Sequence, residues 1–264
     1  MTDTTVLYQE KGAVAIATLN RPQNLNSFNR QMHHDLWAAL DRAEANAQIR
    51  ALVITGAGRG FCAGADLSDF DLSPGPDLVK RADPGPVIEL AFNPTVRRLQ
   101  ALRMPSIAAI NGVAAGAGAS LAMTCDIAIA APTASFIQAF SKIGLVPDAG
   151  GSWFLAQRLG LARAMGLALT GDKLSASQAR DWGMIWDVAD DPLAAARAMA
   201  QRLATMPTKA LVATRALLRS ANTHTLDQQL NVERDTQSAM GATRDYIEGV
   251  SAFLAKRPAV FTGQ

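Results

Sequence analysis

One long apolar stretch, residues 107–131, limits the folds open to this chain more than any other feature. Its length suits a membrane span, but three glycines, an asparagine and an aspartate make that interpretation poor. We instead expect a strand at 107–110, a turn at Asn111-Gly112, a short helix at 119–123 and a second buried strand at 126–130. The stretch then belongs to the core of an α/β domain.

The composition narrows the class of protein. With 264 residues, 49% of them hydrophobic and 18% charged, the chain can form one large globular domain, alone or with a helical appendage, as in cytosolic enzymes. The net charge of +2 gives no strong electrostatic reason to bind nucleic acid or a membrane surface. Cys62 and Cys125 do not indicate a disulfide scaffold, and the three histidines show no metal-ligand spacing. Residues 1–12 lack the features of a signal peptide, so we expect a cytoplasmic location.

Strands and helices alternate along the first part of the chain. Strands are expected at 5–9, 13–19, 51–55, 107–110, 126–130, 135–138 and 184–188. Helices are expected at 27–47, 86–102, 119–123, 152–159, 162–169 and 174–182. Ser27 is the expected N-cap of the first helix, and Gly160 separates the fourth helix from the fifth. Residues 68–86 read as a surface loop near the substrate entrance.

The end of the chain has a different pattern. From residue 191 onward it reads as nearly all helical, with helices at 192–204, 208–221, 226–240 and 243–256. This change predicts an α/β core over residues 1–200 and a helical region over residues 201–264 that serves association between chains.

Two glycine-rich loops, residues 61–67 and 111–120, are the first candidate site. Each follows a buried strand and exposes backbone N–H groups that small side chains do not shield. Two such donors that converge on one point form an oxyanion hole, which would stabilise an enolate grown from a thioester carbonyl. Two ordinary turns remain the alternative. The preceding GAGRG at 56–60 does not fit a dinucleotide fingerprint, because no obvious helix follows it.

Asp148 is the acid that the sequence singles out. It lies between Pro147 and Ala149-Gly150-Gly151, at the head of a predicted helix. Capping that helix and acting as a base of raised pKa among apolar neighbours are equally good interpretations. Asp66 and Asp126 compete with it, although Asp126 starts a buried strand and is better explained as structural.

Other polar residues fit ordinary roles. Ser120 lacks the Gly-x-Ser-x-Gly setting of a nucleophile, so we expect a helix-start serine that satisfies backbone N–H groups. His33, His34 and His224 are scattered, and we expect them to be solvated or partly packed.

These segments together resemble the enoyl-CoA hydratase/isomerase, or crotonase, superfamily. The likeness rests on Arg-Pro at 21–22 with Leu-Asn at 25–26, GFCAGADL at 60–67, NGVAAGAG at 111–118, Cys-Asp at 125–126, GLVP at 144–147 with Gly-Gly at 150–151, and GVSAFLAK at 249–256. The resemblance implies a spiral of ββα units, a helical C-terminal trimerisation region, and trimers or hexamers. It also implies an acyl-coenzyme A substrate, with coenzyme A entering as part of the substrate and no separate cofactor or metal.

The resemblance also implies roles for individual residues. The oxyanion donors would be the backbone N–H groups of Ala65 and Ala117, with an alanine at 117 where the family usually has glycine. Phe253 and Lys256 would reach the coenzyme A of a neighbouring subunit. The other expected substrate contacts are Ala63, near the adenine, and Gly64, Asp66, Leu67, Gly116, Ser120 and Phe140.

The chain departs from the family's hydratases at their two glutamates. Ser120 and Phe140 stand at those positions and cannot position and activate water. Asp148 falls where dienoyl-CoA isomerases carry a catalytic aspartate. The resemblance therefore implies double-bond migration rather than water addition. An ordinary enoyl-CoA isomerase or hydratase-like enzyme of fatty-acid oxidation and a non-catalytic coenzyme A-binding subunit remain alternatives.

Overall fold

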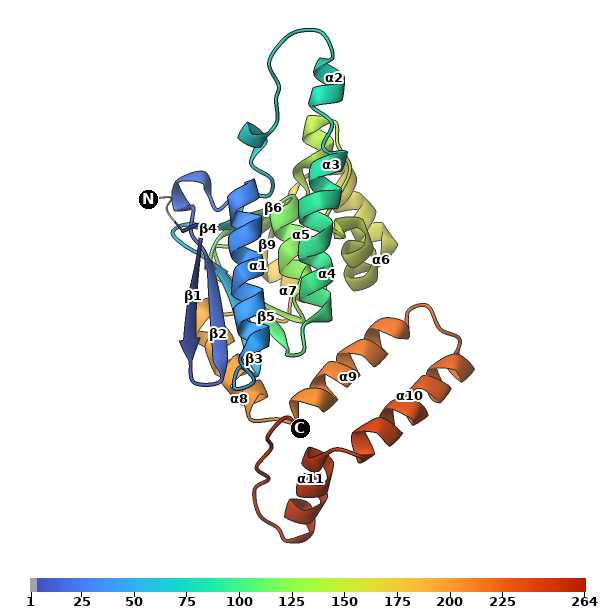
Figure 1. Ribbon diagram of the computed structural model, residues 1–264. Coiled ribbons are helices and arrows are strands. Elements are labelled where there is room, and N and C mark those ends of the chain that lie inside the picture. The colour runs from blue at the N-terminus through green and yellow to red at the C-terminus, as the bar shows by residue number, and fades with distance from the viewer. Residues whose placement is uncertain (1–3) are drawn as a thin grey trace.

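The computed structural model describes residues 4–264, and its strands form two sheets (Figure 1). Residues 1–3 lie outside this range. They belong to residues 1–12, the segment in which we expect no signal peptide. The larger sheet has the order β1-β2-β3-β5-β7-β10 and the smaller one β4-β6-β8-β9. The larger sheet contains β1 Val6–Lys11, β2 Val14–Leu19, β3 Ala51–Gly56, β5 Ser106–Ile110, β7 Ile127–Ala130 and β10 Asp187–Val188. The smaller sheet contains β4 Gly60–Cys62, β6 Val113–Ala115, β8 Ser135–Ile137 and β9 Lys173–Ser175.

The chain repeats one unit three times. In each unit one strand enters the larger sheet, the next enters the smaller sheet, and a helix follows: β3-β4-α4, β5-β6-α5 and β7-β8-α6. The three helices are α4 Asn93–Ala101, α5 Ala117–Thr124 and α6 Gly151–Thr170. Strands β2, β3, β5, β7 and β10 pair in parallel, as do β4, β6 and β8, because helices connect successive turns. The expected spiral of ββα units is confirmed.

Apolar side chains cover both faces of the larger sheet. In β3, Leu52 and Ile54 point into the main core, which α1 Arg30–Ala45 helps to form. Ala51 and Val53 point the other way, onto the alanines of α8 Pro192–Ala204. This two-sided burial explains why the strand sequences are continuously apolar rather than alternating.

Several local expectations were wrong. The N-cap of α1 is Asn29, whose side chain accepts the Met32 N–H at 2.9 Å, and not Ser27. The three-residue strands β4, β6 and β9 were missed, and the strand expected at 184–188 is reduced to β10. Gly160 does interrupt α6, with φ 69 and ψ 164, as expected.

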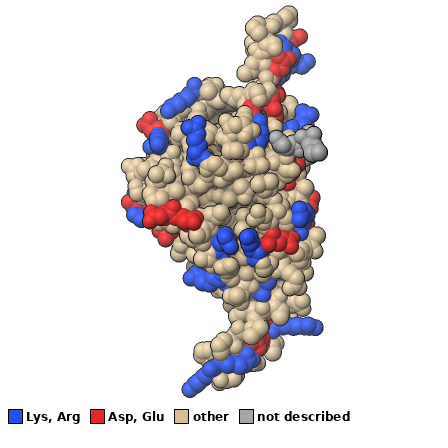
Figure 2. All heavy atoms as spheres, turned by 90° about the vertical axis from the view of Figure 1, so that its left-hand side faces the viewer, with Lys and Arg blue, Asp and Glu red and all other residues tan. Residues whose placement is uncertain are grey.

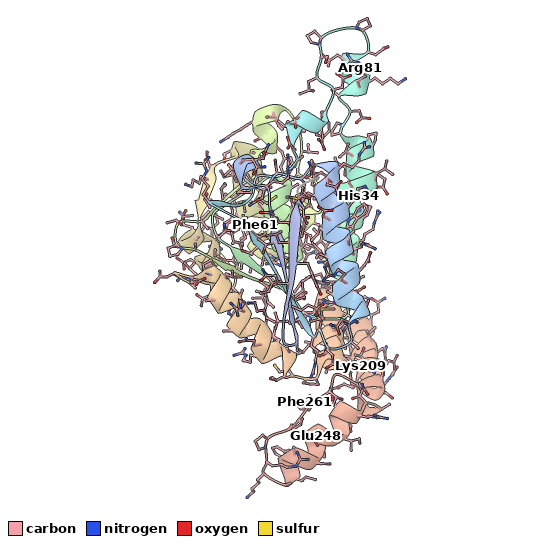
Figure 3. All side chains as sticks on the ribbon, turned by 60° about the vertical axis from the view of Figure 1, so that its left-hand side comes forward. His34, Phe61, Arg81, Lys209, Glu248 and Phe261 are labelled. Atoms are coloured by element: carbon pink, nitrogen blue, oxygen red, sulfur yellow. The ribbon has the colours of Figure 1, made fainter. Side chains whose placement is uncertain are left out.

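The segment expected as an irregular loop is partly helical. It contains a 3-10 turn at Leu67–Asp69 and the short helix α2 Leu78–Arg81, and it leads through α3 Gly85–Val87 and a π-helical turn at Ile88–Phe92 into α4. Figure 1 shows the part around α2 projecting from the body, and Figure 3 places Arg81 there, far from the buried Phe61.

The C-terminal helices extend away from the core (Figure 1). They are α9 Thr208–Ser220, α10 Leu226–Gly241 and α11 Arg244–Leu254; α7 Ala176–Asp181 stays in the core region. Arg215 and Arg219 of α9 form ion pairs with Asp126 at 3.1 and 2.8 Å, so Asp126 is structural, as expected. The expected boundary at residue 200/201 falls inside α8, which packs on the larger sheet through Ala204.

Two broader expectations bear on the surface. Among residues 4–264, no helix has both the length and the apolar character needed to cross a membrane. The apolar stretch 107–131 instead forms β5, β6, α5 and β7. On the face shown in Figure 2, basic and acidic side chains are interspersed over the body of the molecule.

Candidate active site

The two glycine-rich loops meet because β4 and β6 are neighbours. Gly60 pairs with Val113 in parallel register, and the loops follow directly. A Cβ atom on Gly64, whose φ is +98°, would lie 2.9 Å from the Ala115 carbonyl oxygen and 3.3 Å from the Ala117 nitrogen. A Cβ atom on Gly118 would lie 2.1 Å from the Cys62 carbonyl oxygen. Only glycines allow this approach, and it brings the two loops together at one point.

The backbone around Ala65 is held on both sides. The Phe28 N–H donates to the Gly64 carbonyl at 2.7 Å, and the Phe28 carbonyl accepts the Asp66 N–H at 2.8 Å. Ala117 is the first residue of α5, where N–H groups have no partner within the helix. Among residues 4–264, neither the Ala65 nor the Ala117 N–H donates to a protein acceptor.

A cavity of about 200 Å³ opens beside these two N–H groups. It brings together most of the predicted site residues: Ala63, Gly64, Ala65, Leu67, Gly116, Ala117, Phe140 and Asp148. Its other walls are largely apolar: Phe70, Pro84, Val87, Ile88, Phe92, Ala139, Ile143 and Leu145. Asp148 is the one titratable side chain among these described lining residues.

Asp148 is partly buried and does not cap the following helix. The N-cap of α6 is Gly150, and no side chain caps that end. The Oδ1 atom of Asp148 is buried without a hydrogen-bond partner in the described chain. Burial raises the pKa of Asp148 to about 6, because water no longer solvates the ionised carboxylate. The structure therefore excludes the helix-cap interpretation, and the role of Asp148 as a base stays a prediction.

Asp66 does not line this cavity but an adjoining one of about 540 Å³ that also contains Ala65, so its expected substrate contact stays a prediction. It forms an ion pair with Arg21 at 2.7 Å and accepts the Ser68 N–H and hydroxyl. Burial opposes its ionisation, but the hydrogen bonds from Ser68 and Arg21 prevail and lower its pKa. Asp66 therefore supports the loop that carries Ala65.

Ser120 is also absent from the cavity wall. It is fully buried in α5, and its hydroxyl donates to the Asp148 carbonyl oxygen at 3.0 Å. The expectation that it accepts from backbone N–H groups at a helix start was wrong, because its hydroxyl serves as a donor.

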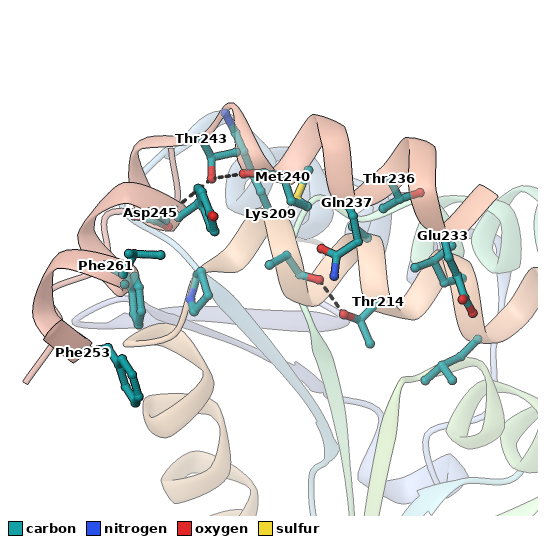
Figure 4. Close-up of a pocket in the computed structure, with 18 of the residues that line it drawn as sticks. Lys209, Thr214, Glu233, Thr236, Gln237, Met240, Thr243, Asp245, Phe253 and Phe261 are labelled. Atoms are coloured by element: carbon teal, nitrogen blue, oxygen red, sulfur yellow. Dashed lines mark hydrogen bonds between the residues drawn. The ribbon is translucent and has the colours of Figure 1, made fainter. Parts of the chain in front are cut away.

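Phe253 and Lys256 lie outside the cavity of their own chain. Phe253 belongs to α11, is 82% exposed and lines a separate groove of about 690 Å³ among the C-terminal helices (Figure 4). Lys256 follows α11 and is exposed.

The burial of His33 was not expected from the sequence. Its side chain is buried between the rings of Phe28 and Phe92, with ring centroids 4.6 and 4.5 Å away. Burial lowers the pKa of His33 to about 4, so the ring is neutral at pH 7. The expectation of a solvated or partly packed ring was wrong here. The signal was available, since His33 lies three residues before Leu36 on the apolar face of α1.

The other two histidines behave as expected. His34 is exposed on α1 (Figure 3), and His224 is partly buried with Nδ1 3.0 Å from the Gln229 Oε1 atom. Within the part of the chain that the structure describes, no group of three or more His, Cys, Asp or Glu side chains could hold a metal ion.

Comparisons with known proteins identify the family and the fold of the chain. The sequence pattern of the family described as "Enoyl-CoA hydratase/isomerase" matches residues 9–264. The chain is 54% identical over 260 residues to the 1,2-epoxyphenylacetyl-CoA isomerase of Escherichia coli (strain K12), covering 97% of both chains. Among solved structures, an enoyl-CoA hydratase from Polaromonas sp. JS666 superposes with a TM-score of 0.88 at 34% identity, covering 97% of this chain and 99% of that one. An enoyl-CoA hydratase from Mycobacterium tuberculosis H37Rv gives 0.86 at 30% identity, covering 99% and 100%.

Proposed function

Because the chain belongs to the enoyl-CoA hydratase/isomerase family and has its crotonase fold, we propose that it is an isomerase of coenzyme A thioesters. One observation carries the proposal. A single ionisable carboxyl, that of Asp148, faces an otherwise apolar cavity beside two unpaired N–H groups. One acid and an oxyanion hole suit the removal and return of one proton.

The N–H groups of Ala65 and Ala117 bind the thioester carbonyl oxygen of the substrate. They stabilise the negative charge that this oxygen gains when the α-proton leaves, and one such donor is worth roughly 2.7–4 kcal/mol in comparable enzymes. The Asp148 carboxylate takes the α-proton of a 3-enoyl thioester and delivers it to the γ-carbon. The double bond moves into conjugation with the carbonyl, and Asp148 is again ionised at the end.

Among the described residues that line it, the cavity lacks the pair of acidic side chains that would position and activate a water molecule. Phe140 is an apolar wall where a hydratase has a glutamate, and Ser120 uses its hydroxyl on the backbone. These contacts support isomerisation over hydration.

The finer assignment is to aerobic phenylacetate catabolism. We propose that the enzyme converts ring-1,2-epoxyphenylacetyl-CoA to the seven-membered oxepin-CoA and shifts 3,4- to 2,3-didehydroadipyl-CoA. The named E. coli relative supports this assignment. Five segments of the chain also resemble enzymes of that kind and support the assignment: residues 24–28, 56–64, 139–142, 184–186 and 222–235. In the epoxide step the hole would steer charge while the ring expands.

Enzymes of this family bind acyl-CoA substrates and are commonly oligomeric. We propose that this chain forms trimers, or hexamers made of two trimers, in which Phe253 and Lys256 contact the coenzyme A of a neighbouring subunit. The exposed apolar side chains of α9, α10 and α11 support such an assembly. A cytoplasmic location stays a prediction.

The test is the variant Asp148→Asn, assayed with a cis-3-enoyl-CoA, a trans-2-enoyl-CoA and ring-1,2-epoxyphenylacetyl-CoA. Loss of the base should lower kcat for double-bond migration roughly 10²–10⁴-fold. Wild-type kcat should fall as the pH drops below about 6, because only the carboxylate accepts a proton. The exposed Asp172→Asn serves as the matched control.

Three results would contradict the proposal. Near wild-type migration by a folded Asp148→Asn would show that Asp148 is not the base. Rapid hydration of the trans-2-enoyl-CoA by the wild-type protein would favour a hydratase. Binding of all three thioesters without any turnover would favour a non-catalytic subunit.

A further inference from the structure

Ser120 links the helix of one oxyanion donor to the loop of the base. Its hydroxyl oxygen lies 3.0 Å from the Asp148 carbonyl oxygen and 3.5 Å from the Gly116 carbonyl oxygen. A hydroxyl has one proton to donate, and the shorter contact is the better hydrogen bond. Ala117 begins the same helix three residues earlier. One rigid element therefore carries both the donor and the anchor of the base.

The backbone that follows Asp148 needs such an anchor. Ala149 adopts a left-handed conformation with φ 49, which is uncommon and strained for a residue with a side chain. The Asp148 carbonyl also accepts the Gly151 N–H at 2.7 Å, so Ser120 completes its pair of hydrogen bonds. A Cβ atom at Gly151 would lie 2.6 Å from the Ser120 Oγ atom, which shows how closely the turn at residues 148–151 packs on α5.

We propose that Ser120 is a positioning residue: its hydroxyl holds the Asp148 backbone so that the carboxyl faces an acyl group bound at Ala65 and Ala117. This inference rests on the proposed function of Asp148 as the base. Ser120 does not touch the carboxyl, and the described residues that line the cavity with Asp148 are all uncharged. Its contribution is therefore to the position and the burial of the carboxyl, and not a direct interaction with its charge.

The primary test is Ser120→Ala, assayed with a cis-3-enoyl-CoA. Misplacing the base should lower kcat roughly 10- to 100-fold while KM stays nearly constant, because the carbonyl donors are unchanged. Without the Ser120 hydrogen bond, the backbone at Asp148 and Ala149 is less constrained and the carboxyl is more exposed to water. The pKa seen in the acidic limb of the kcat–pH profile should therefore move from about 6 toward the ordinary pKa of an aspartate.

Thr124→Val is the matched control. Thr124 is a buried hydroxyl one turn further along α5 that donates to the Ser120 carbonyl at 2.9 Å and has no contact with Asp148. It should lose stability comparably, keeping the wild-type pH profile and most of its kcat. If Ser120→Ala does not fold, Ser120→Cys carries the same test, because a thiol is only a weak donor.

A double-mutant cycle separates this inference from the proposed function. If Ser120 acts through Asp148, Ser120→Ala should have no further effect on kcat in the Asp148→Asn background. Losses of kcat that add in the double variant would overturn the inference alone. So would a kcat of Ser120→Ala within about twofold of wild type together with an unchanged pH profile. Near wild-type turnover by Asp148→Asn would overturn the proposed function, and the inference with it.

Discussion

Asp148 combines properties that an isolated aspartate does not have. An exposed carboxyl is almost wholly ionised at pH 7 and is a weak base. The apolar walls around Asp148 raise its pKa to about 6, which makes it a stronger base that is still ionised at neutral pH. The same burial that suits it to proton transfer makes its charge costly in the folded state.

This cost predicts that Asp148→Asn stabilises the protein at neutral pH. The raised pKa means that the folded state binds a proton between about pH 4 and 6 that the unfolded state has lost, so stability falls as the pH rises through this window. Asparagine carries no charge to bury, and it should raise the free energy of unfolding at pH 7.5 by about 1–2 kcal/mol. Urea unfolding at pH 7.5 and pH 4.5 measures the effect. A gain that persists undiminished at pH 4.5 would contradict this explanation.

At the residue scale, the sequence singled out Asp148 but did not predict its surroundings. Asp148 stands out because it lies between a proline and glycines. Its contact with Ser120 joins residues 28 apart, in different turns of the spiral, and no local pattern encodes it. The burial of His33 could have been recognised from its position on the apolar face of α1.

At the element scale, the juxtaposition of β4 and α5 depends on one glycine. Gly118→Ala should destabilise the protein by several kcal/mol or displace Ala117, because its Cβ atom would overlap the Cys62 carbonyl. Gly166→Ala is the control. Gly166 is exposed within α6 with nothing within 4 Å of its Cβ position, so this change should be neutral or stabilising by up to about 1 kcal/mol. Thermal unfolding of both variants checks the contrast. Equal stability would show that the two loops are not tightly apposed.

The sequence predicts long elements better than short ones, for a physical reason. Strands such as β3 and β5 each contain four apolar residues in a row, and α1 has a clear apolar face, so burial alone identifies them. The strands β4 and β6 have three residues each, too few to show a period, and exist because they pair with each other. The convergence of the two loops follows from that pairing, and so it could only be hypothesised from the sequence.

At the scale of the whole molecule, the C-terminal helices expose several large apolar side chains. Ile247 and Leu254 of α11 are 59% and 74% exposed, and Leu254 lines the groove of about 690 Å³. If these helices associate, Ile247→Glu/Leu254→Glu should shift the protein toward its monomer mass of 27.9 kDa in sedimentation equilibrium. Val79→Glu, at an 89% exposed site on the projecting α2, is the control and should leave the mass unchanged. An unchanged mass for the double variant would place the interface elsewhere.

The spiral has a consequence for how such enzymes diversify. Ala65 follows β4 and Ala117 follows β6, so the two proposed donors lie in successive turns of the spiral, and their spacing follows from the pairing of those strands. The chain between them, from Phe70 through Phe92, supplies much of the cavity wall but does not set that spacing. Changes in the length or sequence of this segment can therefore reshape the cavity while the spacing of the two N–H groups stays constant. Under the proposed function, substrate range and reaction chemistry are then inherited through separate parts of one repeat.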